Sequence, residues 1–104
     1  MELSVGMYVR TKDGCIEKIC AIENEHIYTD EDYLAWYASS NAFSKASYNL
    51  IDLIEVGDYV NGFPVIHKEN DILKCGLLVQ FKENEIKSIV TKEQFSSMEY
   101  KVNE

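Results

Sequence analysis

The chain has 104 residues and a formal net charge of −8 at pH 7. Its length favours one compact domain over two independent ones, and a composition of 46% hydrophobic residues with one proline excludes a disordered chain. A negative surface repels phosphate, so the charge argues against direct binding to nucleic acid. It suits a basic partner, including a protein groove that normally holds nucleic acid, although acidity also serves simply to keep a small protein in solution.

Nothing in the chain predicts secretion or membrane insertion. No run of about 18 apolar residues is present, so we expect no membrane-spanning helix. The first residues, Met1-Glu2-Leu3-Ser4, lack the basic and apolar regions of a signal peptide. Three cysteines, an odd number, fit a reducing compartment better than a disulfide framework. We therefore expect a cytoplasmic protein.

A short motif occurs twice, as Val5-Gly6-Met7-Tyr8-Val9 and as Val56-Gly57-Asp58-Tyr59-Val60, at an offset of 51 residues. Each copy leads into a strand through a glycine, and its Tyr and Val then point to opposite faces. The repeat predicts a mainly β fold of two tandem SH3-like small barrel or meander units, at about 1–54 and 55–104. Units of about 50 residues are marginal alone, so we expect one compact domain in which they share a core or dock tightly.

The first unit is expected to begin as a meander. Turn residues and β-branched runs predict strands at 5–12, at 15–22 and from His26. The stretch from Thr29 to Tyr37 allows two interpretations. One is a short helix capped by Thr29 or Asp30, and the other is an acidic loop followed by an aromatic strand, which aromatic enrichment favours.

The remaining elements are assigned from apolar alternation and turn residues. We expect a loop at 38–47, and at 48–54 either a buried strand or a link that packs between the units. In the second unit we expect strands at 63–67, 72–75, 77–81, 86–91 and 98–102, a turn or helical turn at 82–85, and a short helix at 92–95.

Three cysteines and two histidines are the candidate metal ligands. Zinc takes about four Cys or His ligands in a tetrahedron, and a site joining the two units would use Cys15, Cys20, His67 and Cys75. The spacing of Cys15 and Cys20 differs from that of a zinc knuckle, and an odd separation puts both on opposite faces of a regular strand. The alternative is that the cysteines are small buried hydrophobes and the histidines lie on the surface. A structural zinc is thus the one candidate cofactor.

No residue pattern spells out a reaction. A dyad of Cys75 and His67 has no oxyanion donor or glycine-rich elbow beside it in the sequence. The chain also lacks a phosphate-binding loop, a Gly-x-Gly-x-x-Gly motif and a His-Glu-x-x-His motif. We therefore expect no enzyme activity, with a small enzyme that uses Cys75 as the competing hypothesis.

Acidic residues gather in the predicted turns, and aromatic residues follow the first acidic run. If these turns meet at one end of the fold, their carboxylates imitate phosphate charge and fit a channel lined by Lys and Arg. Trp and Tyr are frequent interface anchors, although a lone Trp is as readily a core residue. The candidate partner-binding residues are Glu23, Glu25, Asp30, Glu31, Asp32, Tyr33, Trp36 and Tyr37.

The doubled motif, the stretch 49–62 and the tail Ile86-Lys87-Ser88-Ile89-Val90-Thr91-Lys92-Glu93-Gln94-Phe95 resemble small phage and prophage proteins of Gram-positive bacteria. Such acidic proteins include anti-CRISPR proteins that inhibit type II Cas9, and some of those carry a structural zinc. The resemblance implies a counter-defence protein in a bacterial host cell that binds a basic surface of Cas9, or of its guide-RNA complex, and blocks nucleic-acid loading. The alternative is a phage accessory or structural module that binds another protein and inhibits nothing.

Overall fold

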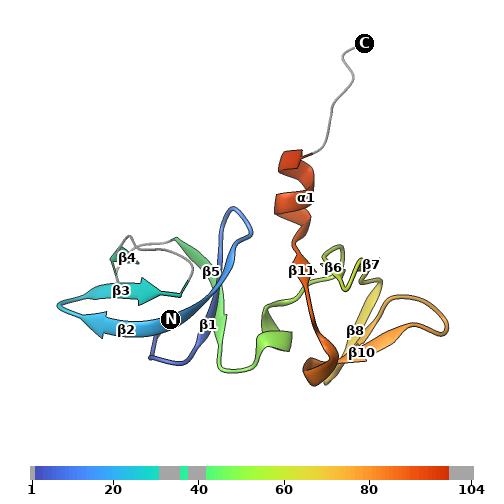
Figure 1. Cartoon of the computed structure of the whole chain (residues 1–104), viewed down its shortest axis with the longest axis horizontal. Helices are drawn as coiled ribbons and strands as arrows, with labels where there is room; N and C mark the ends of the chain where they lie inside the picture. The colour runs from blue at the N-terminus through green and yellow to red at the C-terminus, as the bar shows by residue number, and fades with distance from the viewer. Residues whose placement is uncertain (1, 31–35, 38–41, 99–104) are drawn as a thin grey trace, which may run out of the picture. The chain divides into compact units, whose positions relative to one another are not determined.

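The computed structural model describes residues 2–30, 36–37 and 42–98, with backbone alone for 36–37 (Figure 1). The chain divides into two compact units, Met1–Leu53 and Ile54–Glu104. The division falls one residue before the boundary that the repeated motif predicts. The fold is mainly β, as predicted, and within the described residues the strands form three small antiparallel sheets.

The first unit contains a single five-stranded sheet in the order β4-β3-β2-β1-β5. Its elements are β1 (Tyr8–Thr11), β2 (Ile16–Glu23), β3 (His26–Thr29), β4 (Trp36–Tyr37), β5 (Phe43–Ser47) and the 3₁₀ helix η1 (Leu50–Leu53). Val9, Ile19, Ile27 and Phe43 form its buried core, and Met7 packs against them. The Arg10 side chain is fully buried and donates from Nη1 to the Leu53 carbonyl at 2.9 Å, which ties β1 to the end of η1.

The second unit contains two three-stranded sheets, in the orders β11-β6-β7 and β10-β9-β8. Its elements are β6 (Tyr59–Val60), β7 (Phe63–Pro64), β8 (His67–Glu69), β9 (Ile72–Lys74), β10 (Gln80–Lys82), the 3₁₀ helix η2 (Glu83–Glu85), β11 (Ile89–Val90) and the helix α1 (Lys92–Met98). Its buried apolar residues include Val60 on β6, Leu73 on β9 and Val65 between β7 and β8.

The two units share one strand order. In each, the first strand pairs with the hairpin that follows it on one side and with the last strand on the other side. The second strand also changes partner along its length in both. In the first unit β2 pairs with β1 through residues 16–18 and with β3 through residues 19–23, and a register shift between Ile19 and Ala21 interrupts the second pairing. In the second unit a break at Val65 and Ile66 separates β7 from β8, so the single strand predicted at 63–67 serves two sheets.

The repeated motif forms the same turn in both units. The Gly6 N–H donates to the Ile19 carbonyl at 2.9 Å, and the Ile19 N–H donates to the Met7 carbonyl at 2.8 Å. In the second unit the Gly57 N–H donates to the Val65 carbonyl at 2.9 Å, and the Val65 N–H donates to the Asp58 carbonyl at 2.8 Å. Both glycines have positive φ, 95° and 101°, a region that side-chain-bearing residues rarely adopt. The glycine therefore directs the chain into the first strand.

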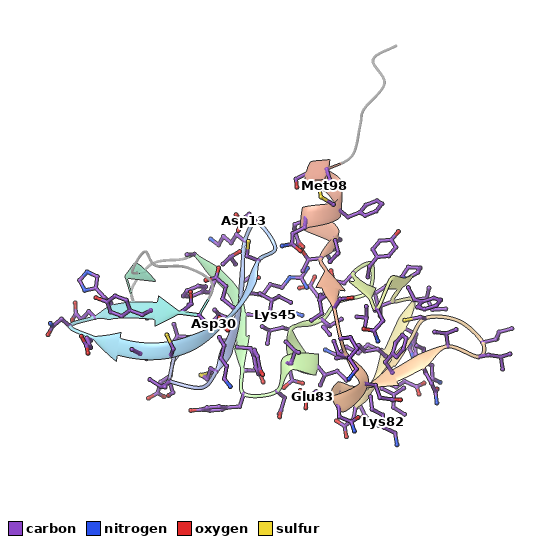
Figure 2. All side chains as sticks on the ribbon, viewed as in Figure 1. Asp13, Asp30, Lys45, Lys82, Glu83 and Met98 are labelled. Atoms are coloured by element: carbon purple, nitrogen blue, oxygen red, sulfur yellow. The ribbon has the colours of Figure 1, made fainter. Side chains whose placement is uncertain are left out.

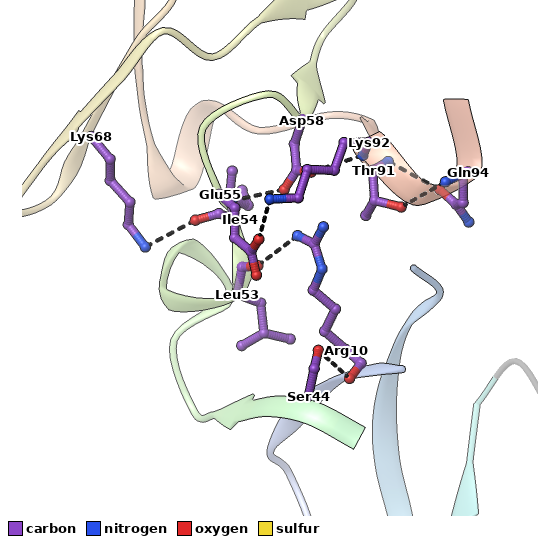
Figure 3. Close-up of polar contacts among 10 residues, drawn as sticks. All are labelled: Arg10, Ser44, Leu53, Ile54, Glu55, Asp58, Lys68, Thr91, Lys92 and Gln94. Carbon is purple, nitrogen blue, oxygen red and sulfur yellow. Dashed lines mark hydrogen bonds and ion pairs between the residues drawn. The ribbon is translucent and has the colours of Figure 1, made fainter. Parts of the chain in front are cut away.

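One position of the motif differs between the units, and this difference accounts for where α1 begins. In the second unit the buried Asp58 carboxylate accepts the Glu55 N–H at 2.7 Å and the Lys92 N–H at 2.9 Å, so it joins the turn to the start of the helix (Figure 3). In the first unit the equivalent residue is Met7, whose sulfur receives the Ser4 N–H at 3.2 Å. Thr91 and Gln94 complete the helix start as a reciprocal capping box.

Several predicted elements are confirmed. β3, η2 and α1 occupy the stretches predicted as strand, helical turn and short helix, and the strand interpretation holds for Trp36 and Tyr37.

Four predicted elements are wrong. The loop expected at 38–47 contains β5, because Phe43 is buried and the segment pairs with β1. Of the two interpretations of 48–54, the strand is wrong, because Leu50–Leu53 form the helix η1 and Ser47 Oγ donates to the exposed Asp52 carboxylate at 2.7 Å. The link that packs between the units stays a prediction. The strand expected at 77–81 begins only at Gln80. Met98, expected to start a strand, ends α1, and residues 99–102 lie outside the described residues.

The motif glycines give a first testable prediction. Gly6→Ala and Gly57→Ala should each lower the free energy of unfolding by about 1–2 kcal/mol, because alanine is strained at this positive φ. Urea denaturation followed by circular dichroism measures the change. Gly76→Ala is the matched control, since a Cβ there has nothing within 4 Å and its φ is not positive, and it should stay within about 0.5 kcal/mol of the wild type. Equal stability of all three variants would contradict the assigned turn.

Asp58 gives a second prediction. Asp58→Ala should cost about 2 kcal/mol, because it leaves the backbone N–H groups of Glu55 and Lys92 without their acceptor. Asp58→Asn keeps one acceptor oxygen and should cost less, and Asp71→Asn, at an exposed turn, should be neutral. Thermal unfolding of the three variants checks this order, which a silent Asp58→Ala would refute.

Candidate functional site

The predicted partner-binding residues of the first unit occupy both ends of β3. Glu23 and Glu25 are exposed at the turn between β2 and β3, where Asn24 and Glu25 adopt positive φ. Asp30 follows the far end of β3, five residues beyond Glu25, which is about 15 Å along an extended chain. The turns at 23–25 and at 30 therefore do not meet at one point, and any acidic face of this unit runs along β3.

Asp30 differs from the other two carboxylates because its side chain has a structural contact. Its carboxylate accepts the Lys18 N–H at 2.8 Å, and its own N–H donates to the Lys18 carbonyl at 3.0 Å (labelled in Figure 2). Glu23 and Glu25 are thus the better candidates for contact with a partner. Glu31, Asp32 and Tyr33 lie outside the described residues, and Trp36 and Tyr37 are placed by their backbone, opposite Ile27 and His26.

The first unit is acidic in sequence and at its surface. Residues 1–53 contain nine acidic and four basic residues. Arg10, one of the four basic residues, is completely buried, and Glu17 is the buried one among the acidic residues that the structure describes in this unit. Glu17 accepts a hydrogen bond from the Thr29 hydroxyl inside the sheet. The buried cation and the buried carboxylate offset each other, so burial leaves the excess of carboxylates over amines unchanged.

The proposed zinc ligands do not form a cluster within either unit. Across the described ranges 2–30 and 42–98, no group of three or more His, Cys, Asp or Glu side chains is arranged to hold a metal ion. The Cys20 thiol donates to the Tyr28 carbonyl at 3.3 Å, and Cys15 lies before β2 rather than on it. Because Cys15 and Cys20 belong to one unit and His67 and Cys75 to the other, the four-ligand zinc site stays a prediction.

His67 and Cys75 make separate contacts in the second unit. His67 faces Lys74 across the hairpin, and its Nε2 lies 3.1 Å from Glu69 Oε1. Hydrogen bonds from Lys74 first, and then from His67, lower the pKa of the Glu69 carboxyl. Burial raises the pKa of the Cys75 thiol, the opposite of the shift that activates a cysteine nucleophile. The shift therefore does not favour Cys75 as a nucleophile.

A shallow depression lies in the second unit. It is lined by Asp71, Ile72, Lys82, Glu83 and Asn84, at the end of the hairpin formed by β9 and β10. Its lining mixes both signs of charge on turn residues, and all but Ile72 and Glu83 are exposed. The depression is therefore open to solvent and carries no single sign of charge.

The most exposed large apolar residues in the described part of the chain were not predicted to be exposed. Leu77 and Leu78 have exposed fractions of 104% and 96% and lie in a bend between β9 and β10, where a strand was expected. A signal was present in the sequence: residues 75–81 contain no charged side chain, and Gly76 interrupts the run. An apolar run broken by glycine fits a loop as well as a strand.

Comparisons with known proteins do not indicate a function. No family model, curated protein or solved structure matches the chain. In the described part of the chain, α1 and the 3₁₀ helices are all far shorter than a membrane-spanning helix. Any function must therefore be inferred from the surfaces described above.

Cys75 gives a third testable prediction. Because burial raises the pKa of its thiol, Cys75 should be alkylated by iodoacetamide at pH 7 more slowly than the exposed Cys20, and its rate should keep rising above pH 9. Mass spectrometry of the tryptic peptides over a pH series measures both rates. Cys75→Ser is the control for peptide assignment. Preferential alkylation of Cys75 at pH 7 would instead support the enzyme hypothesis.

Proposed function

We propose that the protein is a non-enzymatic binding module whose acidic first unit attaches to a basic protein surface. The observation that carries the proposal is the set of exposed carboxylates that the structure describes in the first unit, at 2, 13, 23, 25, 30 and 52, against exposed or half-exposed amines at 12, 18 and 45. An excess of this kind attracts a Lys- and Arg-lined surface and accelerates association with it.

We propose that this basic surface is the nucleic-acid channel of a type II effector such as Cas9. Its support is the resemblance to small phage proteins together with the charge. A carboxylate-rich face competes with phosphate for the same cations, so binding there would block loading of guide RNA or DNA. The protein would then act in the cytoplasm of a bacterial host as a counter-defence protein.

We also propose that each unit has an SH3-like fold. Support comes from the strand order shared by the two units and from the partner change within the second strand of each. Small sheets of this plan commonly bind other proteins through loops and edge strands. The second candidate function, an accessory interaction module without inhibitor activity, is favoured by the exposed leucines of the second unit.

A binding experiment tests the charge-based proposal. The wild-type protein should bind guide-free Cas9 at low salt, and its affinity should fall steadily as salt is raised. The variant Glu23→Gln/Glu25→Gln/Glu31→Gln/Asp32→Asn should lose about tenfold in affinity at low salt and show a shallower salt dependence. Surface plasmon resonance measures both, and a DNA cleavage assay reports inhibition.

Asp71→Asn is the matched control, because Asp71 occupies in the second unit the turn position that Glu25 occupies in the first. It should bind within about twofold of the wild type. Absence of wild-type binding at low salt, or an affinity that does not depend on salt, would refute the proposed function. Binding without inhibition of cleavage would favour the accessory module.

A further inference from the structure

The loop between β9 and β10 presents two leucines entirely to solvent. The Cys75 N–H donates to the Val79 carbonyl at 2.8 Å and closes the loop, so Gly76, Leu77 and Leu78 project beyond the hairpin. Single exposed leucines are common on protein surfaces, but two adjacent and fully exposed ones are not. We refer to residues 75–79 as the leucine tip.

Apolar surface continues at the base of the leucine tip. The Cys75 thiol lies 3.9 Å from the Phe63 carbonyl, and the Phe63 and Phe81 rings are 6.1 Å apart between centroids. Phe63 is 45% exposed, and Ile66, whose N–H donates to the Lys74 carbonyl, is 58% exposed. These exposed apolar residues belong to β7, to the segment after it and to the loop that follows β9, and large exposed apolar surface on a small protein marks an interaction site.

The segment of the first unit that corresponds by strand order to this loop is acidic in sequence rather than uncharged. By strand order, the segment joining β3 to β4 corresponds to the segment joining β9 to β10. The first contains Asp30, Glu31 and Asp32, whereas the second contains no charged residue from Cys75 to Phe81. The second unit therefore has an uncharged stretch where the sequence of the first unit is acidic.

We propose that the leucine tip is an anchor that inserts Leu77 and Leu78 into an apolar pocket of the partner protein that the first unit attracts. The inference rests on the proposed function and adds to it the second kind of contact. Apolar side chains buried in a pocket at the centre of an interface contribute most of the binding free energy, whereas charges at its rim set the association rate.

A second copy of the chain is a poor occupant for the leucine tip. A fully buried leucine removes on the order of 100 Å² of apolar surface from water. Two tips packed together would bury about 400 Å² through four leucines, and a stable interface requires about 1,000 Å² or more. The remaining area must come from a partner that surrounds the leucines with a concave surface.

A lipid bilayer is also a poor occupant. Loops that insert into membranes combine apolar residues with Lys and Arg that attract anionic headgroups. The leucine tip has no cation, and the chain carries a net charge of −8. Its two isobutyl groups contain fewer carbons than one myristoyl chain, which alone binds membranes only marginally. A protein pocket is therefore the occupant that the charge and the area favour.

The test compares Leu77→Ser/Leu78→Ser with the wild type for binding to guide-free Cas9. The variant should bind at least a hundredfold more weakly, because each leucine loses its burial in the pocket. The slope of log affinity against log salt should stay unchanged, since no charge is removed. Val56→Ser, which alters an exposed valine of the same unit outside the leucine tip, is the matched control and should bind like the wild type.

Thermal unfolding, sedimentation velocity and flotation with phosphatidylserine vesicles accompany the binding measurement. The free variant should unfold at the wild-type temperature, because both leucines are already in water.

Equal affinity of variant and wild type for Cas9 would overturn the inference and leave the proposed function standing. Lack of wild-type binding to Cas9 would overturn both. Dimerisation or vesicle binding that depends on the leucines would overturn the inference by assigning them another occupant, and a lowered unfolding temperature would assign them to the chain's own interior.

Discussion

Each unit depends on a glycine that turns the chain into its first strand while its N–H remains bonded to the strand that crosses it. At Gly6 and Gly57 this requires φ near +100° and no Cβ. The hydrogen bond from the glycine and the one returned by Ile19 or Val65 fix where the second strand crosses the first. With that crossing set, Val9 and Val60 are directed inward at the same place in their units, and both are fully buried.

The two units share this turn but differ in the side chain that follows the glycine. Met7 packs into the apolar core of the first unit, and its sulfur meets the Ser4 N–H. Asp58, at the same position, is a buried carboxylate that binds two N–H groups, one of them at the first residue of α1. An ion pair of 2.7 Å between Lys92 and Glu55 lies beside it, and this hydrogen bond raises the pKa of Lys92. The exposed pair contributes little alone, so the buried carboxylate accounts for the position of the helix.

The sequence was informative where local chemistry decides the structure. The repeated glycine motif predicts two units, and the turn and capping residues locate β3, η2 and α1. A second repeat, Glu23-Asn24-Glu25 and Glu69-Asn70-Asp71, marks the same turn in both units, with Asn24 and Asn70 at positive φ. Its offset is five residues shorter than that of the glycine motif because the first hairpin of the second unit is tighter. Alignment of the two halves with that gap would have matched β3 to β9 from sequence alone.

The sequence was uninformative where long-range pairing decides the structure. Nothing local to 43–47 shows that β5 pairs with β1, and the small polar residues there read as a loop until Phe43 is seen in the core. Leu77 and Leu78 present the converse case, since two leucines and a valine read as a buried strand. They are exposed because the hairpin closes between Cys75 and Val79, which leaves the leucines beyond the sheet. The candidate site could not be predicted for the same reason: exposure is a property of the closed sheet.

In the proposed complex the first unit supplies charge and the second unit supplies apolar surface, and these two kinds of contact act over different distances. Carboxylates exposed in the first unit act over a distance of about 8–10 Å, which is the screening length in physiological salt, and so govern the rate of encounter. Leucines act only on contact, and so govern how long a complex persists. A single short loop cannot serve both purposes, because charges beside Leu77 and Leu78 would lose their hydration when the leucines enter a pocket. In the proposed complex, duplication of the unit removes this conflict, since each unit then supplies one kind of contact.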